Sequence, residues 1–179
     1  MNKKGAIWIS AVLYIALGII LISMILAAGL PAVQKMKDKY TVKQTKDLML
    51  VFDENIRVVD HEGPGSQRVI KLKIGRGLFD INEGGNNITW SLNTKVPISE
   101  PSSENSLIDV FEGNLKINTI KTAIEKQYKI NLILEYGEGI DLELDGDTQS
   151  TLSGTFRLSI LNTGHEEGEM ANVIKLTLI

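Results

Sequence analysis

Cysteine is absent from the 179 residues, and histidine occurs only twice. The lack of cysteine excludes disulfide bonds, a thiolate nucleophile and cysteine-based metal sites. Aromatic residues are also scarce, at 6%, and after Leu50 they never cluster with basic residues. We therefore expect no nucleic-acid partner, because such proteins gather basic and aromatic side chains on one surface. A further absence is local, since no side chain from Ala6 to Val33 carries a charge.

This uncharged stretch, called the apolar run below, has the sequence AIWISAVLYIALGIILISMILAAGLPAV. As a helix it would be about 42 Å long, which exceeds the hydrocarbon core of a bilayer at about 30 Å. The run can therefore span a membrane, or pack against other copies of itself. Only the basic pentapeptide MNKKG precedes it.

Charge is distributed unevenly along the chain. The part up to Leu50 has seven lysines and two acids, net +5, whereas the part from Val51 onward has 12 basic and 20 acidic residues, net −8. A basic segment beside an apolar run and an acidic body suit a membrane-proximal stalk that carries a soluble head. The residues after the run are enough for one modest domain.

Three interpretations of the amino terminus compete. A secretory signal cleaved near Ala27-Ala28-Gly29 would need an apolar core of about 7 to 15 residues, and the core here is far longer. A retained signal anchor explains the length. The charge rule does not orient it, because Lys35, Lys37 and Lys39 after the run balance Lys3 and Lys4 before it.

The third interpretation uses the join of Lys3-Lys4-Gly5 to Ala6-Ile7. A tiny basic leader, Gly5, an uninterrupted apolar helix and its continuation resemble the leaders of type IV prepilins and archaellins (class III signal peptides). The resemblance covers about the first 60 residues and implies cleavage by a prepilin peptidase between Gly5 and Ala6. Many bacterial pilins carry a glutamate where this chain has Ser10, so the archaeal branch is the better match.

The resemblance implies a structural subunit without enzymatic activity or cofactor, inserted in the membrane and then polymerised into a cell-surface filament. Its implied partners are sister subunits, the prepilin peptidase, a pilus assembly ATPase and a membrane platform protein. The alternative is a non-polymerising, single-span anchored surface protein with a β-sandwich binding or adhesion domain. For a filament, the residues we expect in the helical core are Ile7, Trp8, Val12, Leu13, Ile15, Leu17, Ile19, Ile22, Ile25 and Leu26.

The helix is predicted to continue beyond the run. Gly29 and Pro31 predict a kink near residues 27–31 but not an end. Apolar residues at spacings of three and four then predict an amphipathic helix to about residue 60. The sequence HEGPGSQ, residues 61–67, cannot continue a helix and predicts a joint before the head. The predicted apolar stripe, which we expect to dock on the head, consists of Leu48, Val51, Phe52, Ile56 and Val59.

From Arg68 to Ile179 the apolar period changes to two, which is typical of strands with one buried face. Six to eight short strands predict an antiparallel sandwich or small barrel, so the fold class is α+β. We assign the ambiguous segment 118–129 to strand and loop. The alternating triplets are Ile70/Leu72/Ile74, Ile88/Trp90/Leu92, Ile130/Leu132/Leu134, Ile140/Leu142/Leu144, Phe156/Leu158/Ile160 and Ile174/Leu176/Leu178.

The head offers few candidates for chemistry. His61 and His165 stand in glycine-flanked turns without the spacing of a metalloprotease, and no phosphate-binding glycine loop occurs. Asn87 begins a possible N-glycosylation sequon, which matters only outside the cell. Four acids two apart form a row that we expect to be solvated, because acids spread along a strand diverge instead of converging on calcium. They are Asp141, Glu143, Asp145 and Asp147.

Overall fold

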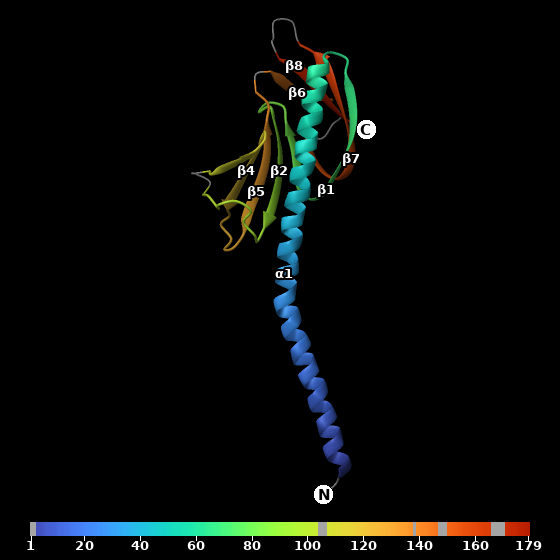
Figure 1. The fold of residues 1–179 in the computed structure, drawn as a ribbon, viewed down its shortest axis with the longest axis vertical. Coiled ribbons are helices and arrows are strands. Elements are labelled where there is room, and N and C mark those ends of the chain that lie inside the picture. Colours follow the sequence, from blue (N-terminus) through green and yellow to red (C-terminus); the bar gives the residue numbers. More distant parts are fainter. Residues whose placement is uncertain (1–2, 104–106, 138, 147–149, 166–170) are drawn as a thin grey trace. The chain divides into compact units, whose positions relative to one another are not determined.

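The computed structural model describes residues 3–103, 107–137, 139–146, 150–165 and 171–179; among residues 3–9, Trp8 is the only one whose side chain is described. The chain divides into two compact units, Met1–Asp38 and Lys39–Ile179. One helix, α1 (Lys3–Glu62), belongs to both units, and eight strands follow it (Figure 1).

The amino-terminal part of α1 is the apolar run, and α1 continues through Pro31 as predicted. Proline removes one hydrogen bond and crowds the carbonyl one turn earlier, but the apolar residues on both sides of Pro31 still favour a helix. This helix is long and apolar enough to cross a membrane, although a signal sequence near an amino terminus meets the same criterion.

The strands of the second unit form one mostly antiparallel, open sheet in the order β3-β4-β5-β2-β1-β7-β8-β6. Its one parallel pair joins β6 to β8. The segment 118–129 is strand, then loop, then strand, as predicted. The strands are β1 (Gln67–Asn82), β2 (Asn87–Thr94), β3 (Asp109–Glu112), β4 (Leu115–Lys121), β5 (Tyr128–Glu135), β6 (Ile140–Leu144), β7 (Thr151–Gly164) and β8 (Asn172–Leu178).

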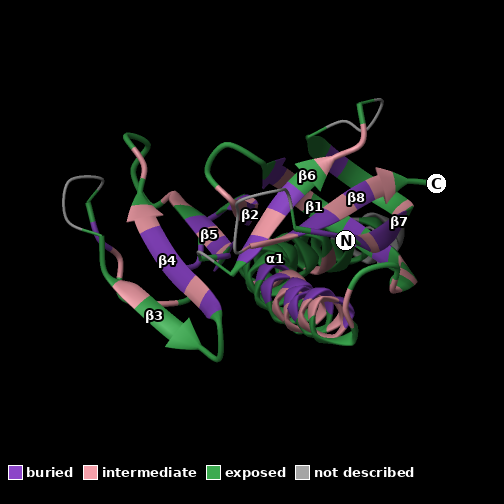
Figure 2. Cartoon of the chain, turned by 90° about the horizontal axis from the view of Figure 1, so that it is seen from above, coloured by how far each residue is buried: buried purple, intermediate pink, exposed green. Residues whose placement is uncertain are grey.

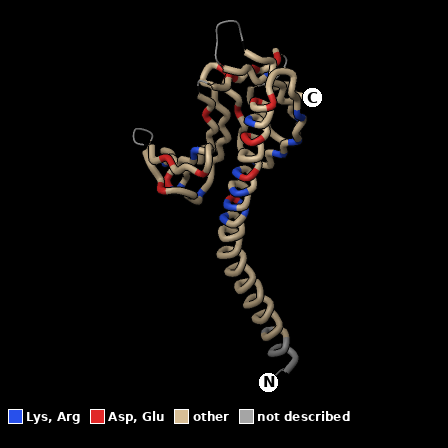
Figure 3. Tube along the Cα trace, turned by 45° about the horizontal axis from the view of Figure 1, so that its top comes forward, with Lys and Arg blue, Asp and Glu red and all other residues tan. Residues whose placement is uncertain are grey.

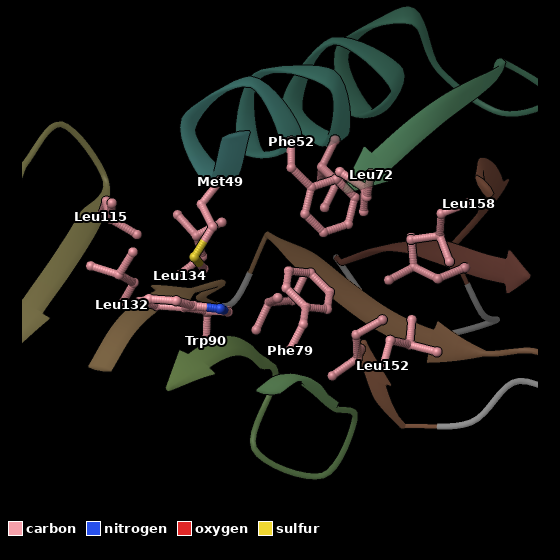
Figure 4. Packing of buried hydrophobic residues seen from close by; sticks show 14 of the residues in the cluster. Met49, Phe52, Leu72, Phe79, Trp90, Leu115, Leu132, Leu134, Leu152 and Leu158 are labelled. Carbon is pink, nitrogen blue, oxygen red and sulfur yellow. The ribbon is translucent and has the colours of Figure 1, made fainter. Parts of the chain in front are cut away.

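The buried face of the sheet is covered by the carboxyl-terminal part of α1. Figure 2 shows buried residues along the strands and along the helix, and Figure 4 shows Met49 and Phe52 pointing from α1 toward the sheet. The Phe52 and Phe79 rings lie 5.8 Å apart between centroids. Apolar side chains from α1 and from the strands thus form a single core.

The α+β class, with a long amino-terminal helix and a largely antiparallel sheet, is confirmed. The head is neither a two-sheet sandwich nor a closed barrel, because an open sheet packs on the helix instead. Alternation along a strand indicates that one face is buried, but it does not indicate whether a second sheet or a helix covers that face. The predicted triplets are largely confirmed, with Trp90, Leu132, Ile160 and Ile174 fully buried.

The predicted docking of α1 on the head is confirmed, but two members of its stripe are wrong. Phe52, Ile56 and Val59 are fully buried. Val51, by contrast, is 55% exposed, and Leu48 is only half-buried. Met49 takes the core position, since it lies three residues before Phe52 and on the same helical face.

The carboxyl end of α1 is held by side chains from outside the helix. The Asn162 amide, fully buried on β7, donates to the Val59 and Asp60 carbonyl oxygens at 3.2 and 3.3 Å. The Ser66 hydroxyl donates to the Val59 carbonyl at 2.6 Å. These bonds satisfy carbonyl groups that have no partner within a helix, so the end of α1 can be buried against the sheet.

The pairing of strand β1 is interrupted near a glycine. Its pairing with β7 shifts in register between Ile74 and Phe79. Gly77 lies in this interval at φ +88°, and a Cβ there would come within 2.5 Å of the Ser91 carbonyl oxygen and 2.6 Å of Trp90 Nε1. Trp90 Nε1 also donates to the Arg76 carbonyl at 3.0 Å. The tight approach of β1 to Trp90 therefore requires glycine at position 77.

We predict that Gly77→Ala lowers the free energy of unfolding by about 2–4 kcal/mol, since it combines backbone strain with a collision in the core. The matched control is Gly75→Ala, because no atom lies within 4 Å of a Cβ built at Gly75. We expect that control to change stability by less than about 0.5 kcal/mol. Urea unfolding of the full chain in detergent micelles, followed by circular dichroism, measures both. Equal effects would contradict the assignment.

Candidate assembly surface

The described large side chains of the apolar run are all exposed. Trp8 and Tyr14 are each 75% exposed, and no part of the most apolar window is buried within the chain. A Cβ built at Gly18 or Gly29 would meet no atom within 4 Å. An uncovered apolar surface of this extent requires lipid or protein around it. Exposed among the predicted core residues are Trp8, Val12, Leu13, Ile15, Leu17, Ile19, Ile22, Ile25 and Leu26.

The predicted cleavage junction lies in the main chain of α1. The side chains of Lys3, Lys4, Gly5, Ala6 and Ile7 lie outside the described part of the structure. The junction therefore remains a prediction from the sequence.

Ser23, a polar residue within the run, has its hydroxyl satisfied by its own helix. Ser23 Oγ donates to the Ile19 carbonyl oxygen at 2.7 Å. A serine bonded in this way needs no partner outside the helix, so it is compatible both with lipid and with a dry helix bundle.

A polar cluster that the sequence analysis did not find joins α1 to the sheet. Asp53, only 5% exposed, accepts hydrogen bonds from Arg57 Nε at 3.0 and 3.1 Å and from Asn114 Nδ2 at 2.8 Å. Asn114 lies in the turn between β3 and β4. Asp53 lies outside the apolar stripe predicted for α1, and the sequence signal for its pairing is an arginine four residues after an aspartate. The cluster fixes the helix against the β3–β4 hairpin.

Tyr136 lies beside this cluster, with the Arg57 guanidinium 5.7 Å from its ring centroid. Its hydroxyl is buried and makes no hydrogen bond of regular geometry among the described residues, although the Asp53 carboxylate lies near enough to act on it. Burial, together with the Asp53 charge, raises the pKa of Tyr136 well above its ordinary value of 10.0. The contribution of Tyr136 to the core is thus mainly that of its ring.

We predict that Asp53→Ala lowers the free energy of unfolding by about 2–3 kcal/mol, because it leaves Arg57 and Asn114 without their shared acceptor. The matched control is Glu54→Ala, since Glu54 is the next residue and is exposed. We expect that control to stay within about 0.5 kcal/mol of the wild type. Urea midpoints measured in detergent compare the two, and a small loss in Asp53→Ala would show that the cluster contributes little.

A second prediction concerns Tyr136→Phe. We expect this variant to lose less than about 0.5 kcal/mol at pH 8, because the hydroxyl it removes makes no hydrogen bond of regular geometry among the described residues. The raised pKa means that the wild-type chain is fully stabilised below about pH 10 and loses stability as the pH rises further, since only the unfolded chain then ionises. The variant should lose less between pH 8 and pH 11, as measured by urea midpoints. Tyr128→Phe, a half-buried control, should retain the wild-type profile, and a larger loss at pH 8 in Tyr136→Phe would show that its hydroxyl is bonded.

Two members of the acidic row of the head, Glu143 and Asp145, are paired with a lysine. Lys175 Nζ lies 3.1 Å from an Asp145 oxygen and 3.6 Å from a Glu143 oxygen. The hydrogen bond to Asp145 raises the pKa of Lys175. Asp147 lies outside the described residues. Within the described ranges, no group of three or more His, Cys, Asp or Glu side chains is placed to hold a metal ion.

The remaining candidates of the head lie apart from one another. His61 lies in the last turn of α1 and is exposed, and His165 is exposed after β7. Asn87 begins β2, is half-buried, and donates from Nδ2 to the Gly85 carbonyl oxygen at 3.0 Å. Thr89 Oγ1 donates to Asn87 Oδ1 at 3.3 Å. The sequon is thus at least partly accessible, and its use remains a prediction.

No family model, curated protein or solved structure matches this chain. The functional proposal below is therefore argued from the sequence and the structure of this chain.

Proposed function

We propose that this protein is a structural subunit of a type IV pilus-like filament, of the archaeal type. In this proposal a prepilin peptidase removes Met1–Gly5, and the mature chain begins at Ala6. Membrane insertion precedes assembly, and an assembly ATPase with its platform protein drives subunits into a filament on the cell surface.

One observation carries the proposal: a single helix is apolar on all sides in its first part and docked by one face in its second. The described large side chains of the run are exposed, whereas Phe52, Ile56 and Val59 of the same helix are fully buried. A core helix of a soluble protein would be buried along its length. A helix that is surrounded first by lipid and later by sister helices needs an exposed apolar part of this kind, next to a part that holds the head.

The proposed assembly follows from the cost of hydration. Moving the surface of the run into water costs tens of kcal/mol at about 25 cal/mol per Å² of apolar area. A subunit therefore leaves the bilayer only by entering the polymer directly, where neighbouring runs replace lipid. Small residues spaced four apart, Ser23 and Ala27, permit close helix contacts in the bundle.

The decisive experiment is intact-mass spectrometry of the protein from its native source, combined with negative-stain imaging of sheared cell-surface material. We expect a mature chain that starts at Ala6 and filaments that contain it. We further expect Gly5→Leu to retain the leader and to stay in the membrane fraction. Gly18→Ala, a glycine substitution inside the run, is the matched control and should be processed normally.

A native chain that keeps Met1 or Asn2 and never appears in sheared filaments would contradict the proposal. That outcome would leave a single-span anchored surface protein. A mature chain that lacks the run altogether would contradict both the filament and the anchor.

A further inference from the structure

Four lysines follow the apolar run within ten residues of its end. They are Lys35, Lys37, Lys39 and Lys43, called the lysine collar below, and all four are exposed. Figure 3 shows the uncharged stretch of α1 followed by basic segments. The one acid among them, Asp38, is buried and accepts a hydrogen bond from Gln34 Nε2 at 2.9 Å.

The collar differs from the next lysine along the helix. Lys46 Nζ lies 2.7 Å from a Glu112 carboxylate oxygen, so its charge is paired within the head. No carboxylate is found within ion-pair distance of the collar lysines in the parts of the chain that the structure describes. Lysines at spacings of four repel one another on a helix. The collar therefore concentrates positive charge that no described carboxylate pairs within ion-pair distance.

The position of the collar fits the polar layer of a membrane. The run is about 42 Å long as a helix, and a bilayer with its headgroups is about 40–45 Å thick. A membrane-inserted run would thus end where the phosphates lie, and Lys35 follows two residues after Val33. Tyr40, which is 68% exposed, is of the residue type that concentrates in this layer.

We propose that the lysine collar binds the phosphates of anionic membrane lipids, so that the inserted precursor gathers such lipids around its stalk. The proposal rests on the membrane stage of the proposed function, but not on polymerisation. Basic residues next to a span are attracted to an anionic surface, and the attraction weakens beyond a Debye length of about 8 Å. Lys35 and Lys37, the nearest to the run, should contribute most.

The test uses the full chain reconstituted into phosphatidylcholine vesicles that contain one third phosphatidylglycerol. Electron paramagnetic resonance of spin-labelled lipids measures the motionally restricted fraction of each lipid next to the protein. We expect phosphatidylglycerol to be preferred over phosphatidylcholine by about threefold or more at low salt, and the preference to decrease at high salt. Replacing the four collar lysines by glutamine should bring the ratio close to one.

The matched control replaces four exposed head lysines by glutamine, Lys71, Lys73, Lys95 and Lys121, and changes the net charge equally. That variant should keep the wild-type preference. An unchanged preference in the collar variant, or an equal loss in the control, overturns the collar proposal and leaves membrane insertion intact. If the collar variant kept the lipid preference but formed no filaments in sheared cell-surface material, the collar lysines would contact sister subunits instead of lipid. Absence of restricted lipid of either kind would overturn membrane insertion as well.

Discussion

The rest of the structure depends on one constraint, the exclusion of water from the apolar run. The run has no charge and no cover of its own, and its described large side chains are exposed. Burial of apolar surface is the dominant favourable term in both folding and association. The run must therefore always have an apolar environment, and each later stage in the proposed life of the protein is an exchange of one environment for another.

The head meets a related constraint by using the same helix. An isolated open sheet with one apolar face would expose that face, and here α1 supplies the missing layer through Met49, Phe52, Ile56 and Val59. The buried Asp53 cluster and the Asn162 amide then define where along α1 the sheet packs. One helix thus contains the apolar run in its first part and contributes apolar side chains to the core of the head in its second part.

The sequence predicted the elements well but not how they combine. Alternation marked the strands because each has one buried face, and Trp90, Leu132 and Ile174 are indeed fully buried. Which face of the helix is buried was harder to predict from the sequence. Residues 48–52 are all apolar, so they are compatible with more than one buried face. Only the sheet decides that Met49 is buried and Val51 is not. The Asp53 cluster depends on Asn114, 61 residues away, so no local pattern could reveal it. The apolar run, in contrast, is visible in the sequence because it is continuous and uncharged, and its described large side chains are exposed.

The hold of β7 on the end of α1 has a consequence for biosynthesis. Asn162 bonds to the carbonyl of Val59, 103 residues earlier. At about 5–20 residues per second, the ribosome needs roughly 5–20 s to supply that amide after the helix has emerged. During this interval the Val59 carbonyl lacks the hydrogen bond from Asn162. The carboxyl end of α1 is therefore completed late in synthesis, after most of the sheet has been made.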